Sequence, residues 1–144
     1  MEVKIQALFC DHVRRDAEGT FILIGVYPGI IFLEKDLGKT VNNFIQINDL
    51  PAGKHKVRLH VTFEPKNGGD LVTMAKQSTS IHGEDDMDQI AVVLTPMGLE
   101  LGMEEEGKIR LFIGIDDDDE IEVASLVVKL FEHDPEEGQP ETRD

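Results

Sequence analysis

Apolar residues recur at every second position through most of this chain, and this period of two restricts it to β-structure. Between Lys54 and Phe63 one face is apolar and the other polar: Val57, Leu59, Val61 and Phe63 against Lys56, Arg58, His60 and Thr62. No segment keeps a helical period over ten or more residues. Residues 35–43 have room for a short helical turn, but Gly38 and the β-branched pair Thr40 and Val41 disfavour it.

Turn signals separate the apolar runs along the whole chain. Residues 65–70 (PKNGGD) and the four aspartates at 116–119 are the strongest of them. Between the turns we predict strands over residues 6–15, 21–26, 30–33, 44–47, 54–63, 71–80, 89–94, 108–115 and 121–131. Eight or nine short strands predict an all-β fold, an antiparallel β-sandwich of the immunoglobulin or C2 type. An open β-barrel is the alternative.

The length of 144 residues fits one domain with a sizeable core. We assign residues 1–131 to this domain. Residues 132–144 carry six acidic residues, one arginine and two prolines, with no apolar side chain. This composition predicts a disordered acidic tail.

The chain is strongly acidic, with 29 acidic and 14 basic residues and a formal net charge of −15. Nucleic acids and anionic membranes both require a basic surface, so we expect neither as a partner. The single cysteine, Cys10, cannot form an internal disulfide. With no secretory leader and no apolar run near the ~20 residues that span a bilayer, we expect a cytoplasmic protein.

The opening segment carries a recognisable pattern. Ala7, Cys10, Asp11 and Val13 are followed by Gly19 and by the run from Leu23 to Tyr27 (LIGVY). This pattern resembles a widespread family of small uncharacterised bacterial and phage β-sandwich proteins. Two further segments look like the same group: Pro51, Gly53 and His55 at a strand entry, and residues 105–112 as the penultimate strand. The resemblance implies a β-sandwich from a bacterium or phage, and no assigned activity.

Acidic loops are the feature that could carry chemistry. If consecutive strands are antiparallel neighbours, the loop at residues 82–88, the turn at 116–119 and the connection at Asn48 and Asp49 lie at one end of the sandwich. Clustered carboxylates on flexible loops suit Ca²⁺, which takes six to eight oxygen ligands. The candidate ligands are Asp85, Asp86, Asp88, Asp116, Asp117, Asp118 and Asp119. Solvated turns of an acidic protein explain the same residues, so we otherwise expect no cofactor.

No catalytic residue can be named from the sequence. Cys10 and His12 would share one face of a strand, but an apolar run around Cys10 indicates a buried core thiol. His55 and His60 are an odd number of residues apart and should face opposite sides. A hydrolase would need two positioned carboxylates, which 29 acidic residues do not identify.

We predict structural roles for several residues of the N-terminal segment and of the segment 54–58. We expect Asp11 to accept hydrogen bonds from backbone donors at the first hairpin, and Gly25 to Gly29 to bend the chain between two strands. Lys54, Lys56 and Arg58 should pair with acidic residues of neighbouring strands. An acidic tail or partner docking there is the alternative.

These observations favour a non-catalytic binding or assembly module over an enzyme. We expect a protein partner, or self-association as a homodimer, through an exposed sheet edge or loop end. The first alternative is a Ca²⁺-dependent ligand-binding sandwich, and a hydrolase is the third.

Overall fold

The computed structural model describes residues 3–83, 89–96, 98–102 and 104–132, and the side chains of residues 89–91 are not considered. Ten strands make up the described chain, and no helix long and apolar enough to cross a membrane occurs in these ranges. The strands are β1 (Lys4–Arg15), β2 (Phe21–Tyr27), β3 (Ile30–Glu34), β4 (Lys39–Pro51), β5 (Lys54–Pro65), β6 (Val72–His82), β7 (Gln89–Leu94), β8 (Leu99–Leu101), β9 (Gly107–Ile115) and β10 (Ile121–Phe131).

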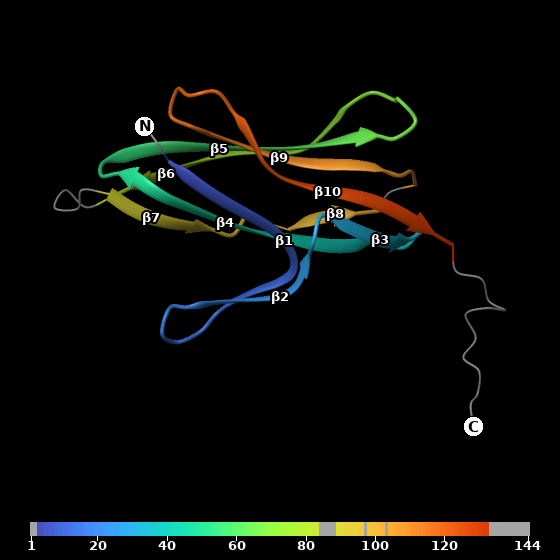
Figure 1. Cartoon of the computed structure of the whole chain (residues 1–144), viewed down its shortest axis with the longest axis horizontal. Coiled ribbons are helices and arrows are strands. Elements are labelled where there is room, and N and C mark those ends of the chain that lie inside the picture. The colour runs from blue at the N-terminus through green and yellow to red at the C-terminus, as the bar shows by residue number, and fades with distance from the viewer. Residues whose placement is uncertain (1–2, 84–88, 97, 103, 133–144) are drawn as a thin grey trace.

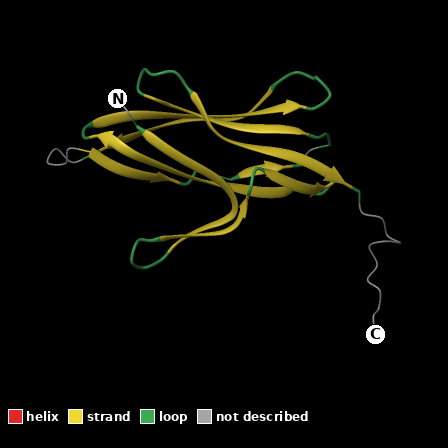
Figure 2. Ribbon diagram, viewed as in Figure 1, coloured by secondary structure: helices red, strands yellow, loops and turns green. Residues whose placement is uncertain are grey.

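The strands form two sheets packed face to face, which confirms the predicted β-sandwich over the open barrel (Figures 1 and 2). One sheet has the order β2-β1-β4-β7, with β8 also paired to β4. The other has the order β3-β10-β9-β5-β6. The inner faces of both sheets supply the core, as the alternating burial of β5 and β9 illustrates. From these two strands the core takes Val57, Leu59, Val61, Phe63, Ile109, Leu111, Ile113 and Ile115.

Pro28 and Gly29 carry the chain from one sheet to the other, because β2 is in the first and β3 is in the second. Gly29 has a φ of 96°, and Gly25 within β2 has a φ of 70°. Both values lie in the left-handed region that favours glycine. The predicted bend at Gly25 to Gly29 is therefore confirmed.

Three elements differ from the prediction. Residues 39–43 form the start of β4 and hold no helical turn, since Lys39 to Val41 pair with β8. The three-residue strand β8 has no counterpart in the predicted set. Finally, β3 lies parallel to β10, whereas every other strand pair is antiparallel. The crossing between sheets explains this orientation, because β3 does not enter its sheet through a hairpin.

The predicted body ends where β10 ends, at Phe131. Of the predicted tail, Glu132 is described, and it forms an ion pair with Lys35 at 3.6 Å. The remainder, residues 133–144, lies outside the described residues.

Candidate interaction surface

The edge strand β2 presents three exposed β-branched side chains. Ile22 is 47% exposed, Ile24 41% and Val26 45%, and in the described part of the chain β2 pairs with β1 alone. Its residues run FILIGVY, without a charge or a proline. Natural edge strands usually carry charged residues or proline, which discourage pairing with another chain. The free side of β2 is therefore an unprotected edge.

The other edges of the described chain differ from β2. The edge strand β7 also lacks charge and proline, but its described side chains, at residues 92–94, are only partly exposed. The edge strand β6 is longer but mostly polar, with Lys76 and Gln77 near its middle. The edge strand β3 has five residues and one strongly exposed side chain, Phe32. Among these four edge strands, β2 has the longest row of exposed apolar side chains on one face in the described residues.

The hairpin of β1 and β2 bends away from the two sheets, and its loop projects from the body (Figure 1). The Phe21 ring contacts the Phe44 ring of β4 edge-on, with centroids 5.6 Å apart. The guanidinium of Arg15 lies over the Phe21 ring as well, 5.6 Å from the ring centroid. These contacts hold the hairpin against β4 while Ile22 and Ile24 remain exposed.

Asp16 caps the hairpin turn. Its carboxylate accepts hydrogen bonds from the backbone N–H groups of Glu18 and Thr20, both at 2.9 Å, and from the Thr20 hydroxyl. These bonds lower the pKa of Asp16, the hydroxyl bond most of all. The prediction that Asp11 has this role was wrong. Asp16 stands at the turn itself, whereas Asp11 lies within β1, opposite the end of β2.

Asp11 instead joins the end of β2 to the start of β4. Its carboxylate accepts a hydrogen bond from the Tyr27 hydroxyl and forms an ion pair with Lys39 at 3.3 Å. Its backbone carbonyl accepts from the Asn42 side chain at 2.6 Å. The Tyr27 bond, and then Lys39, lower the pKa of Asp11, while burial and the Asp11 bond raise the pKa of Tyr27.

Gly25 leaves the space that the Asp11 carboxylate occupies. A Cβ atom built at Gly25 would lie 2.5 Å from Asp11 Oδ2, closer than such atoms approach in proteins. A side chain at position 25 would therefore displace the Asp11 carboxylate from its bonds with Tyr27 and Lys39.

Cys10 is fully buried, and His12, two residues along, is exposed. Burial is the larger cause that raises the pKa of the Cys10 thiol, and the charge of Asp11 adds to it. A raised pKa leaves less of the nucleophilic thiolate at neutral pH. Cys10 is a core residue, as its apolar surroundings predicted.

The predicted gathering of loops is confirmed for the start of the 82–88 loop and for the turn at 116–119, whereas Asn48 and Asp49 lie within β4 and form no connection. The N–H of Gly83 donates to the carbonyl of Gly53 at 2.9 Å, and the N–H of Asp116 donates to that of Lys56 at 2.8 Å. The starts of β5 and β10 and the ends of β6 and β9 therefore share one end. Three predicted calcium ligands, Asp85, Asp86 and Asp88, lie outside the described residues.

In the acidic turn after β9, the Asp116 carboxylate and the Asp118 carbonyl contact hydrogen-bond donors of β5. Asp116 Oδ2 lies 2.8 Å from Nδ1 of His55, and Oδ1 accepts from the backbone N–H of Lys56 at 2.9 Å. The carbonyl of Asp118 accepts from Arg58. No group of three or more potential metal ligands occurs among the described residues, Asp117 and Asp119 included. The calcium site stays a prediction.

His55 and His60 face opposite sides of β5, as expected. His55 is buried, and its two ring nitrogens lie beside two acceptors, the Asp116 carboxylate and the carbonyl of Pro51 at 2.6 Å. Both nitrogens can donate only when the ring is protonated. The bond with Asp116 is the main cause that raises the pKa of His55, and the same bond lowers that of Asp116.

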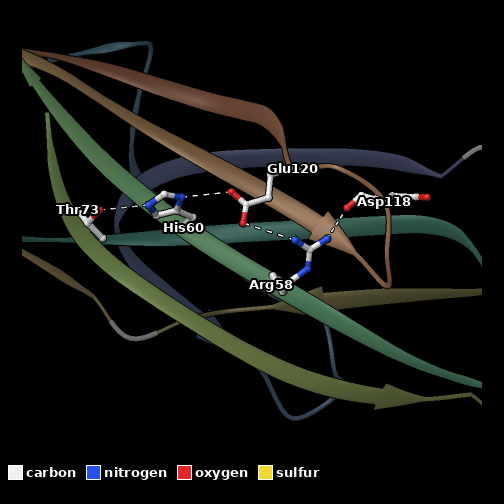
Figure 3. A network of polar contacts seen from close by, with 5 residues as sticks. All are labelled: Arg58, His60, Thr73, Asp118 and Glu120. Atoms are coloured by element: carbon white, nitrogen blue, oxygen red, sulfur yellow. Dashed lines mark hydrogen bonds and ion pairs between the residues drawn. The ribbon is translucent and has the colours of Figure 1, made fainter.

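A polar network covers the outer face of β5 (Figure 3). Glu120 lies 3.8 Å from Arg58 and 3.2 Å from Nδ1 of His60, whose Nε2 lies 3.4 Å from the Thr73 hydroxyl. Gly114 makes room for the Arg58 guanidinium, since a Cβ atom there would lie 2.4 Å from Nη2. Arg58 does pair within the molecule, but with Glu120 of the turn before β10 and not with a residue of a neighbouring strand as predicted.

Comparisons with known proteins return little. No protein-family model and no curated protein matches the chain. Among solved structures the chain is similar to a β-glucosidase from Listeria innocua in complex with gluconolactone, with a TM-score of 0.43 and 13% identity. The match covers 92% of this chain and 16% of that enzyme. At this distance the likeness says nothing about activity.

Proposed function

We propose that this chain is a non-catalytic binding and assembly module whose β2 edge pairs with an added strand, and that a second copy of the chain supplies this strand. The observation that carries the proposal is the row of Ile22, Ile24 and Val26 on an edge without charge or proline. Strand addition satisfies the open backbone groups of such an edge and covers its apolar side chains.

The charge around β2 is less unfavourable to a second copy than the charge of the chain as a whole. Residues 11–27 contain two arginines and three acidic residues, whereas the whole chain has 14 basic and 29 acidic residues. The β1 partners of Ile22 and Phe21 are Arg14 and Arg15. Two acidic molecules therefore meet with less repulsion along β2 than over an average part of the chain.

The edge is also self-complementary. In an antiparallel pair of two β2 strands, the β-branched side chains of one copy face those of the other, a favourable cross-strand arrangement. Such a contact uses the same patch on both copies and closes as a two-fold dimer. A strand of seven residues spans only about 20 Å, so we expect a small interface and a weak, concentration-dependent dimer.

Sedimentation over a concentration series tests the proposal. The wild-type chain should approach twice the monomer mass as its concentration rises. Ile24→Lys should remain a monomer, because it places a charge on the exposed row. Ser78→Lys, a matched change on the edge strand β6, should dimerise like the wild type. A monomer at every wild-type concentration, or dimers of Ile24→Lys, would overturn the second copy as the occupant.

A further inference from the structure

A hollow of about 480 Å³ lies on the outer face of the second sheet, away from β2. Thr62, Arg110 and Phe112 of β5 and β9 line its base. His60 and Glu64 of β5, Leu71 and Glu120 complete its lining. Its size is within the range of small-molecule sites.

The charged groups around the hollow are closely balanced. Arg110 donates to Glu64 at 2.9 Å and to Glu122 at 3.2 Å. Glu120 lies beside His60 and Arg58 in the network of Figure 3. Each carboxylate retains free lone pairs for further bonds, because a carboxylate has about four acceptor positions.

Thr62 is the second, independent observation. Its side chain is 3% exposed, and its hydroxyl has no hydrogen-bond partner within the described structure. Nε of Arg110, beside Thr62 in the β5–β9 register, has none either. Buried polar groups are nearly always paired with protein or ordered water. Both atoms are covered by neighbouring side chains, so a polar ligand in the hollow reaches them once the Arg110 side chain, which is 33% exposed, moves aside.

The ligand must offer hydrogen-bond acceptors to Arg110 and hydrogen-bond donors to Glu64 and Glu120. An organic cation has no acceptor for Nε of Arg110. A carboxylate or phosphate has no donor for Glu64 and Glu120, and both would repel it. A hydroxyl group both donates and accepts. Phe112 and Leu71 add apolar surface that can cover the C–H face of a ring.

We propose that this hollow binds a neutral, polyhydroxylated ligand, a saccharide. Its hydroxyl groups donate to Glu64 and Glu120 and accept from Arg110, and one of them pairs with the Thr62 hydroxyl. Side chains around the base shift slightly as the ligand enters, as is common on binding. Glu64 and Glu120 each form an ion pair with an arginine, and the proposal is for binding alone.

An NMR titration of the full chain with D-glucose, D-galactose and D-mannose tests the proposal. At least one sugar should give saturable shifts of the Thr62, Leu71 and Phe112 amides at millimolar concentration. Thr62→Val should raise the Kd about tenfold, the value of one hydrogen bond. The same variant should melt at a higher temperature than the wild type, since it removes an unpaired buried hydroxyl. Thr79→Val, on β6 outside the hollow, should leave the Kd unchanged.

Guanidinium chloride and sodium acetate serve as competing probes. Shifts at the hollow with either salt but with none of the sugars would overturn the proposal, as would no shift with any probe. An unchanged Kd in Thr62→Val would also overturn it. If that variant does not fold, Glu64→Gln replaces it. Glu64 is exposed and the glutamine amide can still accept a hydrogen bond from Arg110, so this variant should fold and bind sugar more weakly.

Discussion

Asp11 connects three segments through one residue, with bonds to Tyr27, Lys39 and Asn42. Asp11→Ala should lower the free energy of unfolding by about 1–3 kcal/mol, because it removes charge-assisted bonds at the base of the hairpin. Chemical denaturation measures the change. Tyr27→Phe tests the cause, since its effect should shrink in the Asp11→Ala background. Full additivity of the two substitutions would contradict a shared bond.

His55 should make stability depend on pH. Its pKa in the folded chain is raised above 6.5, so its bond with Asp116 contributes fully below 6.5 and is lost as the pH rises through the folded value. The pKa of Asp116 is lowered below 3.8, so its own contribution is present above 3.8 and is lost as the pH falls through the folded value. The pair therefore stabilises most between these limits.

His55→Gln isolates this contribution from the other histidines. The variant should be less stable by about 1–3 kcal/mol at mildly acidic pH, because both bonds of the imidazolium are lost or weakened. The difference from the wild type should narrow as the pH rises past the folded pKa of His55. Urea unfolding across the pH range measures it. A constant difference at all pH values would show that His55 does not titrate with folding.

At the scale of elements, β2 depends on the backbone that Gly25 supplies. Gly25→Ala should cost about 1–3 kcal/mol from its φ of 70° alone, and more because the new Cβ displaces the Asp11 carboxylate. Gly29→Ala is the matched control, since its φ is 96° and no atom lies within 4 Å of its Cβ position. Thermal unfolding should rank Gly25→Ala below Gly29→Ala. Equal melting temperatures would remove the steric argument.

Period-two patterns located strands that have one buried face, such as β9 and β10, to within a residue. The pattern could not reveal β8, because Leu99–Leu101 is too short to show a period. It also missed the start of β4, where Asn42 and Asn43 favour turns by propensity. Pairing with β1 and β8 overrides that preference.

The candidate sites were less predictable than the strands. The outer row of β2 gives a weak signal in the unbroken apolar run FILI, since a strand with one buried face would alternate. The hollow gives none, because it combines Thr62 with Arg110 through the β5–β9 register and adds Glu120 from a turn. Register between distant strands is a tertiary property.

At the scale of the whole molecule, the two proposed sites divide the surface by chemistry. The β2 edge is apolar and lies on one sheet, and the hollow is polar and lies on the other. Because the two sites lie on different sheets, we expect a substitution in one to leave binding at the other unchanged. Ile24→Lys should abolish self-association without changing sugar binding, and Thr62→Val should do the reverse.

The net charge of −15 predicts how the dimer responds to salt. Two molecules of like charge repel one another, and ions screen this repulsion over about 10 Å at 0.1 M and about 3 Å at 1 M. An apolar contact along β2 is itself insensitive to screening. The dimer should therefore tighten several-fold as NaCl is raised, measured by sedimentation, while Ile24→Lys stays monomeric at every salt concentration.

The opposite slope would identify a different contact. If salt weakens the dimer, attraction between unlike charges must hold it, and β2 contains no charge. The basic row of Lys54 and Lys56 against an acidic surface of the second copy would then be the better explanation. The Ile24→Lys variant shows whether the β2 row is needed for the dimer, and the salt series shows whether charge attraction holds it. Together the two measurements distinguish an apolar strand addition from an electrostatic contact.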